Sequence, residues 1–219
     1  MGERKISPLY RLIKAAVRAV YPKIKVVGEE NLPPEPVVYV GNHSQMNGPI
    51  ACELYTPGEH YIIAPLSQLV FTNANTIGVY HDTRILSTFK KTVAALQEGA
   101  SVVIFPEHHV PRNNIICEFQ DRFIDVAKLY YKRTGKALAF VPQYLAPSLK
   151  TMYLGKPIRF QPDAPLEEER RRICEYLMEQ VTQMAQALPK HIVVPYPNMP
   201  KKQYPCNVPQ EAVYEKTGN

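Results

Sequence analysis

Tryptophan is absent, cysteine is scarce and no long apolar run occurs in this sequence of 219 residues. No stretch reaches the roughly 18 consecutive apolar residues that a membrane-spanning helix needs, and the basic N-terminal region lacks the apolar core of a secretory signal. The four cysteines, at positions 52, 117, 174 and 206, include no CxxC pair and no zinc-type spacing to histidine. We therefore predict a protein of the reduced cytoplasm, without a spanning segment, a secretory signal or a zinc site.

The positive charge is concentrated at one end of the chain. The net charge is +6, and residues 1–25 carry seven basic residues against one acidic residue, whereas the remainder is balanced. Such a basic segment attracts an anionic membrane surface, nucleic acid or an acidic carrier protein. No nucleic-acid-binding motif accompanies the charge, so we expect no nucleic-acid partner.

Residues 1–23 are predicted to contain a basic amphipathic helix. Apolar residues recur at helical spacing from position 9 to position 20, and the opposite face is basic. The basic residues of that face are Arg11, Lys14 and Arg18. A helix of this kind can lie in a bilayer interface, with its apolar stripe among the acyl chains and its cations at the headgroups. The alternative is a helix whose stripe covers the core, and the sequence leaves both open.

Short β-rich runs alternate with helical patterns along the rest of the chain. Strands are predicted at 24–27, 37–40, 61–64, 101–105 and 138–142, and helices at 86–97, 119–131 and 166–188. This alternation predicts an α/β fold, with a mixed, largely parallel sheet and packed helices in a single domain over residues 24–188. Functional residues are then expected in loops at the carboxyl ends of strands.

The C-terminal segment, residues 189–219, is rich in proline. It contains six prolines in 31 residues. Because proline disfavours helix and sheet interiors, we predict an extended tail on the surface.

A polar loop containing a histidine follows the strand predicted at 37–40. Its sequence is Gly41-Asn42-His43-Ser44-Gln45-Met46-Asn47-Gly48-Pro49. A histidine in such a loop can serve as a general base, because its ordinary pKa of about 6.5 leaves it largely neutral at working pH. A single loop histidine is, however, more often structural than catalytic.

Three further blocks follow in order along the chain. The block Phe105-Pro106-Glu107-His108-His109-Val110-Pro111 directly follows a predicted strand, and the other two span residues 78–84 and 140–142. Parallel strands place their carboxyl ends at one edge of a sheet, so we expect His43 and Glu107 to face one cleft.

Together these blocks resemble the motifs of the bacterial 1-acylglycerol-3-phosphate acyltransferase family. The family's Asn-His-x4-Asp-Pro motif is matched by Asn42, His43 and Pro49, and the start of its Phe-Pro-Glu-Gly-Thr-Arg motif by residues 105–107. Its second motif is similar to residues 78–84 and its Val-Pro strand to residues 141–142. The likeness runs from about residue 24 to residue 188. It implies a glycerolipid-acyltransferase-like fold and activity.

In that family the histidine takes a proton from the acceptor hydroxyl, which attacks a fatty acyl thioester, while the aspartate orients the imidazole. The resemblance thus implies that His43 is the base and that Glu107 orients it or contacts the acceptor. It also implies acyl-CoA or acyl carrier protein as donor, a glycerolipid-like or other lipid as acceptor, and no cofactor. We expect the protein at the inner face of the membrane, as a peripheral protein.

The motif aspartate is missing. Its position holds Gly48, and none of the six histidines has an aspartate five residues further on. In a serine-protease triad, loss of the orienting carboxylate lowers turnover by about 10⁴-fold. The chain therefore needs a substitute, for which Glu107 is a better candidate by charge than the amide of Asn47. Otherwise it is a non-catalytic lipid-binding protein of the same fold.

The third motif also departs from the family pattern, because His108 and His109 replace its Gly-Thr and a valine replaces its arginine. That arginine grips the acceptor's phosphate in the family, so Arg84 is the best candidate for the missing cation. Arg112 is near in sequence but is typical of a solvated surface residue. Adjacent histidines rarely face one metal ion, so we expect His108 and His109 to line the acceptor pocket together with Asn42, and we predict no metal site.

Overall fold

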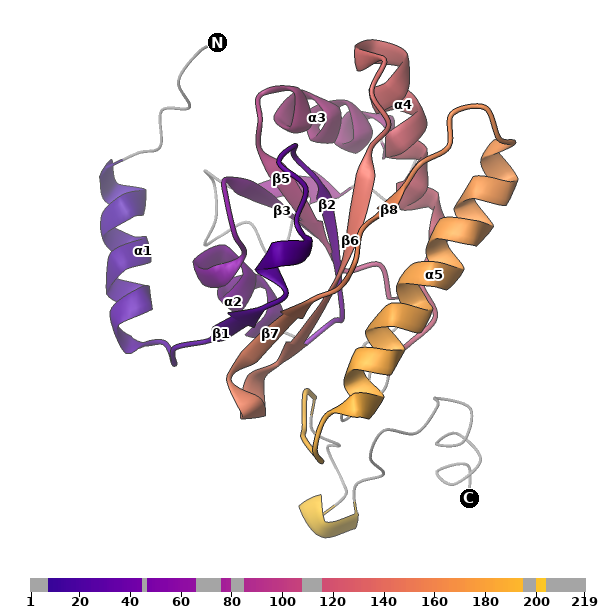
Figure 1. Cartoon of the computed structure of the whole chain (residues 1–219). Helices are drawn as coiled ribbons and strands as arrows, with labels where there is room; N and C mark the ends of the chain where they lie inside the picture. Colours follow the sequence, from indigo (N-terminus) through magenta and orange to yellow (C-terminus); the bar gives the residue numbers. More distant parts are fainter. Residues whose placement is uncertain are drawn as a thin grey trace.

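Runs of buried β-branched and aromatic residues form the sheet at the centre of the molecule (Figure 1). The structure is a computed structural model that describes residues 8–44, 47–65, 76–79, 85–107, 116–194 and 200–203. The strands are β1 (Lys25–Val27), β2 (Val38–Gly41), β3 (His60–Pro65), β4 (Thr76–Val79), β5 (Ser101–Ile104), β6 (Ala139–Ala146), β7 (Thr151–Leu154) and β8 (Ile158–Arg159). Their order is β1-β7-β6-β2-β5-β3-β4, with β8 paired to β6.

The sheet is mixed and largely parallel. The central strand β2 pairs in parallel with β5 on one side and with β6 on the other, and β3 pairs in parallel with β4 and β5. The antiparallel pairings among the described strands are those of β6 with β7 and of β6 with β8. The predicted fold class, a single α/β domain with a mixed, largely parallel sheet, is therefore confirmed.

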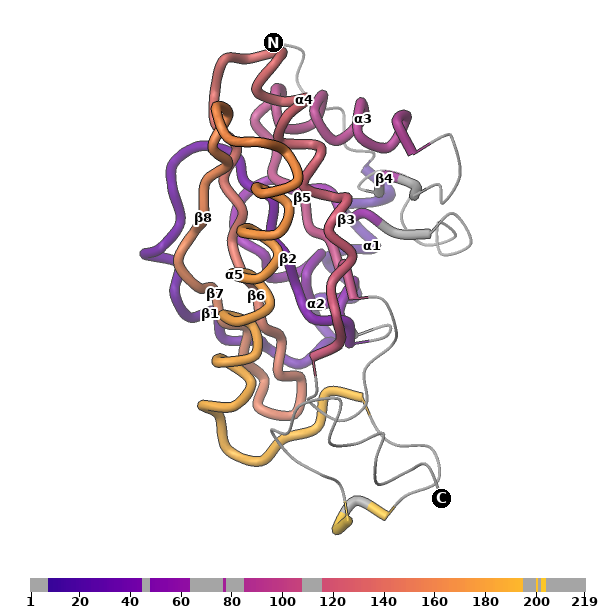
Figure 2. The backbone as a smooth tube through the Cα atoms, turned by 90° about the vertical axis from the view of Figure 1, so that its right-hand side faces the viewer, coloured from indigo at the N-terminus to yellow at the C-terminus, as the bar shows by residue number. Residues whose placement is uncertain are grey.

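Helices cover both faces of the sheet, and the alternation along each strand shows which residues serve which face. The helices are α1 (Pro8–Val20), α2 (Asn47–Tyr55), α3 (Ile85–Gln97), α4 (Asp125–Thr134) and α5 (Leu166–Ala187). Val38 and Val40 belong to the core shared with α3, α4 and α5, whereas Val37 and Tyr39 belong to the core shared with α2. Figures 1 and 2 show α5 running alongside β6, and α3 beside the β4 end of the sheet.

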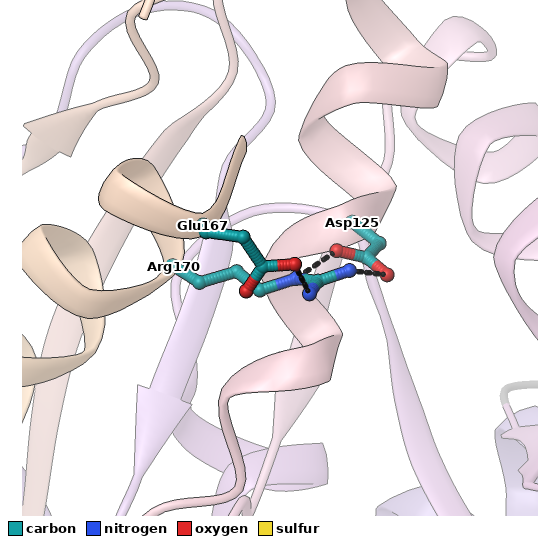
Figure 3. A network of polar contacts seen from close by, with 3 residues as sticks. All are labelled: Asp125, Glu167 and Arg170. Carbon is teal, nitrogen blue, oxygen red and sulfur yellow. Dashed lines mark hydrogen bonds and ion pairs between the residues drawn. The ribbon is translucent and has the colours of Figure 1, made fainter. Parts of the chain in front are cut away.

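The N-terminal turn of α5 is held to α4 by a charged cluster (Figure 3). The Arg170 guanidinium donates to both carboxylate oxygens of Asp125, from Nε at 2.6 Å and from Nη2 at 2.7 Å. Its Nη1 donates to Glu167, one turn earlier on α5, at 2.6 Å. Bidentate pairing fixes the orientation as well as the distance, so α5 is placed firmly over its face of the sheet.

Three differences from the predicted elements have physical reasons. Helix α2 lies where only a polar loop was predicted, since proline is tolerated in a helix's first turn and Pro49 lies there. The helix predicted at 119–131 begins instead as a 3-10 turn, Asp121–Ile124, before α4 continues to Thr134. The strand β7 was missed because its antiparallel pairing with β6 depends on the short turn at Pro147–Leu149.

The start of the C-terminal segment is not a surface tail. Val193 and Val194 are buried in the core beside α5, and so is the ring of His191. His191 Nδ1 donates to the Pro189 carbonyl at 2.7 Å, so its Nε2 is the acceptor for the Tyr144 hydroxyl at 2.6 Å. The prediction of a surface tail is therefore wrong for residues 191–194, and residues 195–199 and 204–219 lie outside the described residues.

Helix α1 contacts the body through its polar face. The Glu53 carboxylate on α2 accepts hydrogen bonds from the Tyr10 hydroxyl and from Lys14 Nζ, the latter at 2.7 Å. The Arg18 guanidinium lies 5.5 Å from the centroid of the Tyr55 ring. No residue of α1 is buried, and its apolar stripe is exposed. The alternative of a helix whose stripe covers the core is therefore wrong.

Among the described helices, none combines the length and the apolar character needed to cross a bilayer.

Candidate functional site

The candidate site lies where β2 and β5 end. These neighbouring strands are parallel and in register, with Val40 opposite Ile104. The segments 42–44 and 105–107 therefore leave the sheet side by side at its carboxyl edge, the usual position of sites in open α/β sheets. The structure thus brings the segments of His43 and Glu107 together.

Glu107 is the buried link between these segments. Its Oε2 accepts the main-chain N–H of His43 at 2.9 Å, and its Oε1 accepts the main-chain N–H of Cys117 at 3.2 Å. Burial raises the pKa of the Glu107 carboxyl well above its ordinary value, and the two amide hydrogen bonds oppose that rise. Glu107 therefore fixes the main chain of His43. From the sequence it was expected to orient the imidazole or to contact the acceptor instead.

The neighbouring backbone of Glu107 is also fixed. Glu107 forms an isolated antiparallel bridge with Phe119, and the N–H of Gln120 donates to the Pro106 carbonyl at 2.9 Å. Pro106 and Glu107 are thus tied to the segment that leads into α4.

The His43 ring lies half-buried against the Phe105 ring. Their centroids are 6.1 Å apart with an interplanar angle of 67°, an edge-to-face arrangement. Burial lowers the pKa of His43 below its ordinary value, so the imidazole is neutral at pH 7. A neutral imidazole at the edge of the sheet is able to accept a proton from a hydroxyl group.

Asn42 holds the loop after β2 against β6. Its Oδ1 accepts the N–H of Leu145 at 2.7 Å, and its Nδ2 donates to the carbonyl of Leu145 at 3.1 Å. The side chain is buried and both ends of its amide pair with main-chain groups. This pairing favours an architectural role over the substrate contact predicted from sequence.

Gly48, at the position of the family's aspartate, lies in the first turn of α2. An ideal Cβ built on it would lie 2.8 Å from Ser44 Oγ and 3.4 Å from Phe105 Cε1. A side chain at position 48 would therefore contact the Phe105 ring, which packs against the His43 ring. The burial of Ser44 was not predicted, because a serine in a polar loop is ordinarily solvated.

Several predicted site residues lie outside the described part of the chain: Arg84, His108, His109 and Arg112, and the side chain of Asn47. Within the described residues, no group of three or more histidine, cysteine, aspartate or glutamate side chains is arranged to hold a metal ion.

The same architecture occurs among solved structures. A solved structure with this fold is the 1-acyl-sn-glycerophosphate (LPA) acyltransferase PlsC from Thermotoga maritima, which superposes with a TM-score of 0.56. The match covers 82% of this chain and 82% of that one, at 15% sequence identity. No protein-family model matches the chain, and no curated protein matches it by sequence. The likeness establishes the fold.

Proposed function

We propose that this protein is an acyltransferase that moves a fatty acyl group from acyl-CoA or acyl carrier protein to a glycerolipid-like or other lipid acceptor. The observation that carries the proposal is the position of His43. It is a half-buried histidine whose backbone is fixed by the buried Glu107 at the carboxyl edge of the sheet, in a fold shared with an LPA acyltransferase.

The proposed reaction uses His43 as a general base. Its neutral imidazole takes the proton of the acceptor hydroxyl while the hydroxyl oxygen attacks the thioester carbonyl. The carbon–sulfur bond then breaks, and the imidazolium returns the proton to the leaving thiolate. The products are an ester and a free thiol, so no cofactor takes part. Arg84 is proposed as the anion contact of the acceptor, with His108 and His109 lining its pocket.

A second candidate function is lipid binding without turnover. Gly48 supplies no carboxylate to His43, which favours this alternative. The retained Asn42, His43 and Glu107 favour the enzyme.

Release of thiol separates the two candidates. We expect the purified protein to release free thiol from acyl-CoA or acyl carrier protein when a total lipid extract is present, and not when the extract is omitted. Thiol is measured with a chromogenic disulfide reagent. Retention of lipid by the protein without thiol release from either donor would support the lipid-binding alternative.

We also propose that α1 binds an anionic membrane surface. Its apolar stripe projects away from the body: Leu9, Leu12, Ile13 and Val20 are 64%, 68%, 51% and 85% exposed. The polar face is turned toward α2, where Lys14 is paired with Glu53. A stripe left outward fits a bilayer interface, where the acyl chains cover the apolar residues, and the exposed Arg11 can meet the headgroups while Lys14 stays paired with Glu53.

Vesicle sedimentation tests this placement. Deletion of residues 1–20 is expected to abolish binding to vesicles that contain phosphatidylserine or phosphatidylglycerol. Leu12→Asp is expected to weaken binding about 10- to 100-fold, because burying a leucine side chain contributes about 1.5–3 kcal/mol. Ala15→Asp changes the charge equally on an exposed position outside the stripe, and is expected to weaken binding much less. If the truncated protein is folded and binds as well as the full chain, α1 is not the membrane contact.

A further inference from the structure

We infer that Phe105 is a positioning residue for the proposed reaction: its ring restrains the imidazole of His43 and shields it from water. The inference rests on the proposed function. It assigns a role in the reaction to a side chain that cannot itself exchange a proton.

The first observation is the direct contact between the two rings. The centroids of the His43 and Phe105 rings lie 6.1 Å apart with an interplanar angle of 67°. Rings in this arrangement attract, because the positive edge of one meets the negative face of the other. The hydrogen bond from the His43 main chain to Glu107 fixes the backbone but leaves the side chain free to change rotamer. Contact with the phenyl ring restrains that change.

The second observation is the close approach of two glycines to the phenyl ring. An ideal Cβ on Gly41 would lie 3.3 Å from Cε1 and 3.4 Å from Cδ1 of Phe105. One on Gly48 would lie 3.4 Å from Cε1 and 3.5 Å from Cζ of the same ring, and 2.8 Å from Ser44 Oγ. Neither glycine has a positive φ, so the backbone conformation does not require glycine at either position. The absent side chains leave the space that one edge of the Phe105 ring occupies.

The third observation is that the main chain of Phe105 is held in place. Phe105 directly follows β5, whose last residue Ile104 lies opposite Val40 of β2. The carbonyl of the next residue, Pro106, accepts the N–H of Gln120 at 2.9 Å. The ring itself packs against the core shared with α2. Because cores are packed as densely as organic crystals, a ring held in this way is a rigid surface for the imidazole.

The consequence for the base is a neutral imidazole in an apolar setting. Burial lowers the pKa of His43, and an apolar ring in contact with the imidazole contributes to that burial. The carboxyl group of Glu107 is engaged by main-chain amides, and position 48 supplies no carboxylate. Packing against Phe105 thus favours the form of His43 that accepts a proton. It stabilises the imidazolium less than a carboxylate would.

Phe105→Leu tests the assignment, because it removes the ring but keeps an apolar side chain. We expect kcat to fall about 2- to 10-fold with KM little changed, which is the usual contribution of an edge-to-face pair. Phe105→Ala also admits water, so it should lower kcat further and raise the pKa of His43 toward about 6.5. NMR titration measures that pKa, with His43→Ala identifying the ring signals. The acid limb of kcat/KM should move upward with it.

Phe123→Leu is the matched control. The rings of Phe123 and Phe140 form a similar edge-to-face pair, with centroids 5.9 Å apart and an interplanar angle of 69°, in the core shared with α3, α4 and α5. Its loss should lower the free energy of unfolding about as much as Phe105→Leu does, without changing kcat or the pKa of His43. A merely structural Phe105 would behave like this control.

Gly41→Ala tests the close approach of the ring. The new Cβ requires the phenyl ring to move by a few tenths of an ångström, so both stability and kcat should fall. In Gly41→Ala/Phe105→Leu the smaller side chain leaves room for the methyl group. The stability loss should then be less than the sum of the two single losses, while kcat stays at the level of Phe105→Leu. Additive stability losses would show that the ring does not occupy this space.

The outcomes distinguish this inference from the proposed function. If Phe105→Leu and Phe105→Ala keep the wild-type kcat and the wild-type pKa of His43 while His43→Ala is inactive, the inference is wrong and the proposed function stands. Phe105→Leu decides alone should Phe105→Ala not fold. If the wild type transfers no acyl group, the proposed function fails, and the positioning role fails with it even where NMR shows that the ring shields the imidazole.

Discussion

Replacing His43 by alanine is expected to slow acyl transfer by about 10²- to 10⁴-fold, the usual contribution of a general base. The loss should appear in kcat, since the imidazole acts on the proton that moves in the transition state. Initial rates with saturating acyl thioester and lipid extract measure it. His60→Gln is the matched control: His60 lies at the opposite edge of the sheet, at the start of β3, and its replacement should leave kcat nearly unchanged once folding is verified.

The rate should also depend on pH through His43. Because burial lowers its pKa, the imidazole stays neutral to lower pH than an exposed histidine. The acid limb of kcat/KM is therefore expected below about pH 6.5, the ordinary value for histidine. The contribution of His43 to the free energy of unfolding depends on pH in the same direction. It is fully present above about pH 6.5 and is lost as the pH falls through the lowered pKa of the folded state. An acid limb above 6.5 would contradict this environment for His43.

Glu107→Ala is expected to have the largest effect on stability. It removes the acceptor of two main-chain amides, those of His43 and Cys117, and each amide left unpaired costs about 1–3 kcal/mol. Glu107→Gln keeps one acceptor oxygen and should lose roughly half as much. Chemical denaturation measures both changes, with Glu98→Ala as the control, since Glu98 is an exposed carboxylate after α3.

Activity should follow the same order among these variants. The backbone of His43 loses its fixed position when the Glu107 carboxylate is removed, so acyl transfer should fall more in Glu107→Ala than in Glu107→Gln. A Glu107→Ala protein as stable and as active as the Glu98→Ala control would show that the buried carboxylate does not hold the loop.

Much of the fold could be predicted because local pattern and tertiary structure agree. The apolar runs that became β2 and β5 are short and buried on both faces, as expected of central parallel strands. Their parallel pairing then predicted that the segments of His43 and Glu107 would meet. The apolar stripe of α1 was also evident in the sequence, but the sequence did not reveal whether the stripe covers the core or is exposed.

The details of the site could not be predicted, because they depend on contacts between distant residues. Glu107 contacts the main chain of His43, 64 residues earlier, and a main-chain amide leaves no mark on the amino-acid pattern. The pairing of Asn42 with Leu145 spans 103 residues and could not be recognised in the sequence, so Asn42 was predicted to bind substrate.

The most direct test of the central claim is detection of the new ester itself. A lipid extract is incubated with an isotope-labelled acyl thioester and either wild-type protein or folded His43→Ala, and the lipids are analysed by mass spectrometry. We predict a labelled ester that accumulates with the wild type and is nearly absent with His43→Ala. Equal amounts of labelled ester with both proteins, or no labelled ester with the wild type from either donor class, would contradict the account.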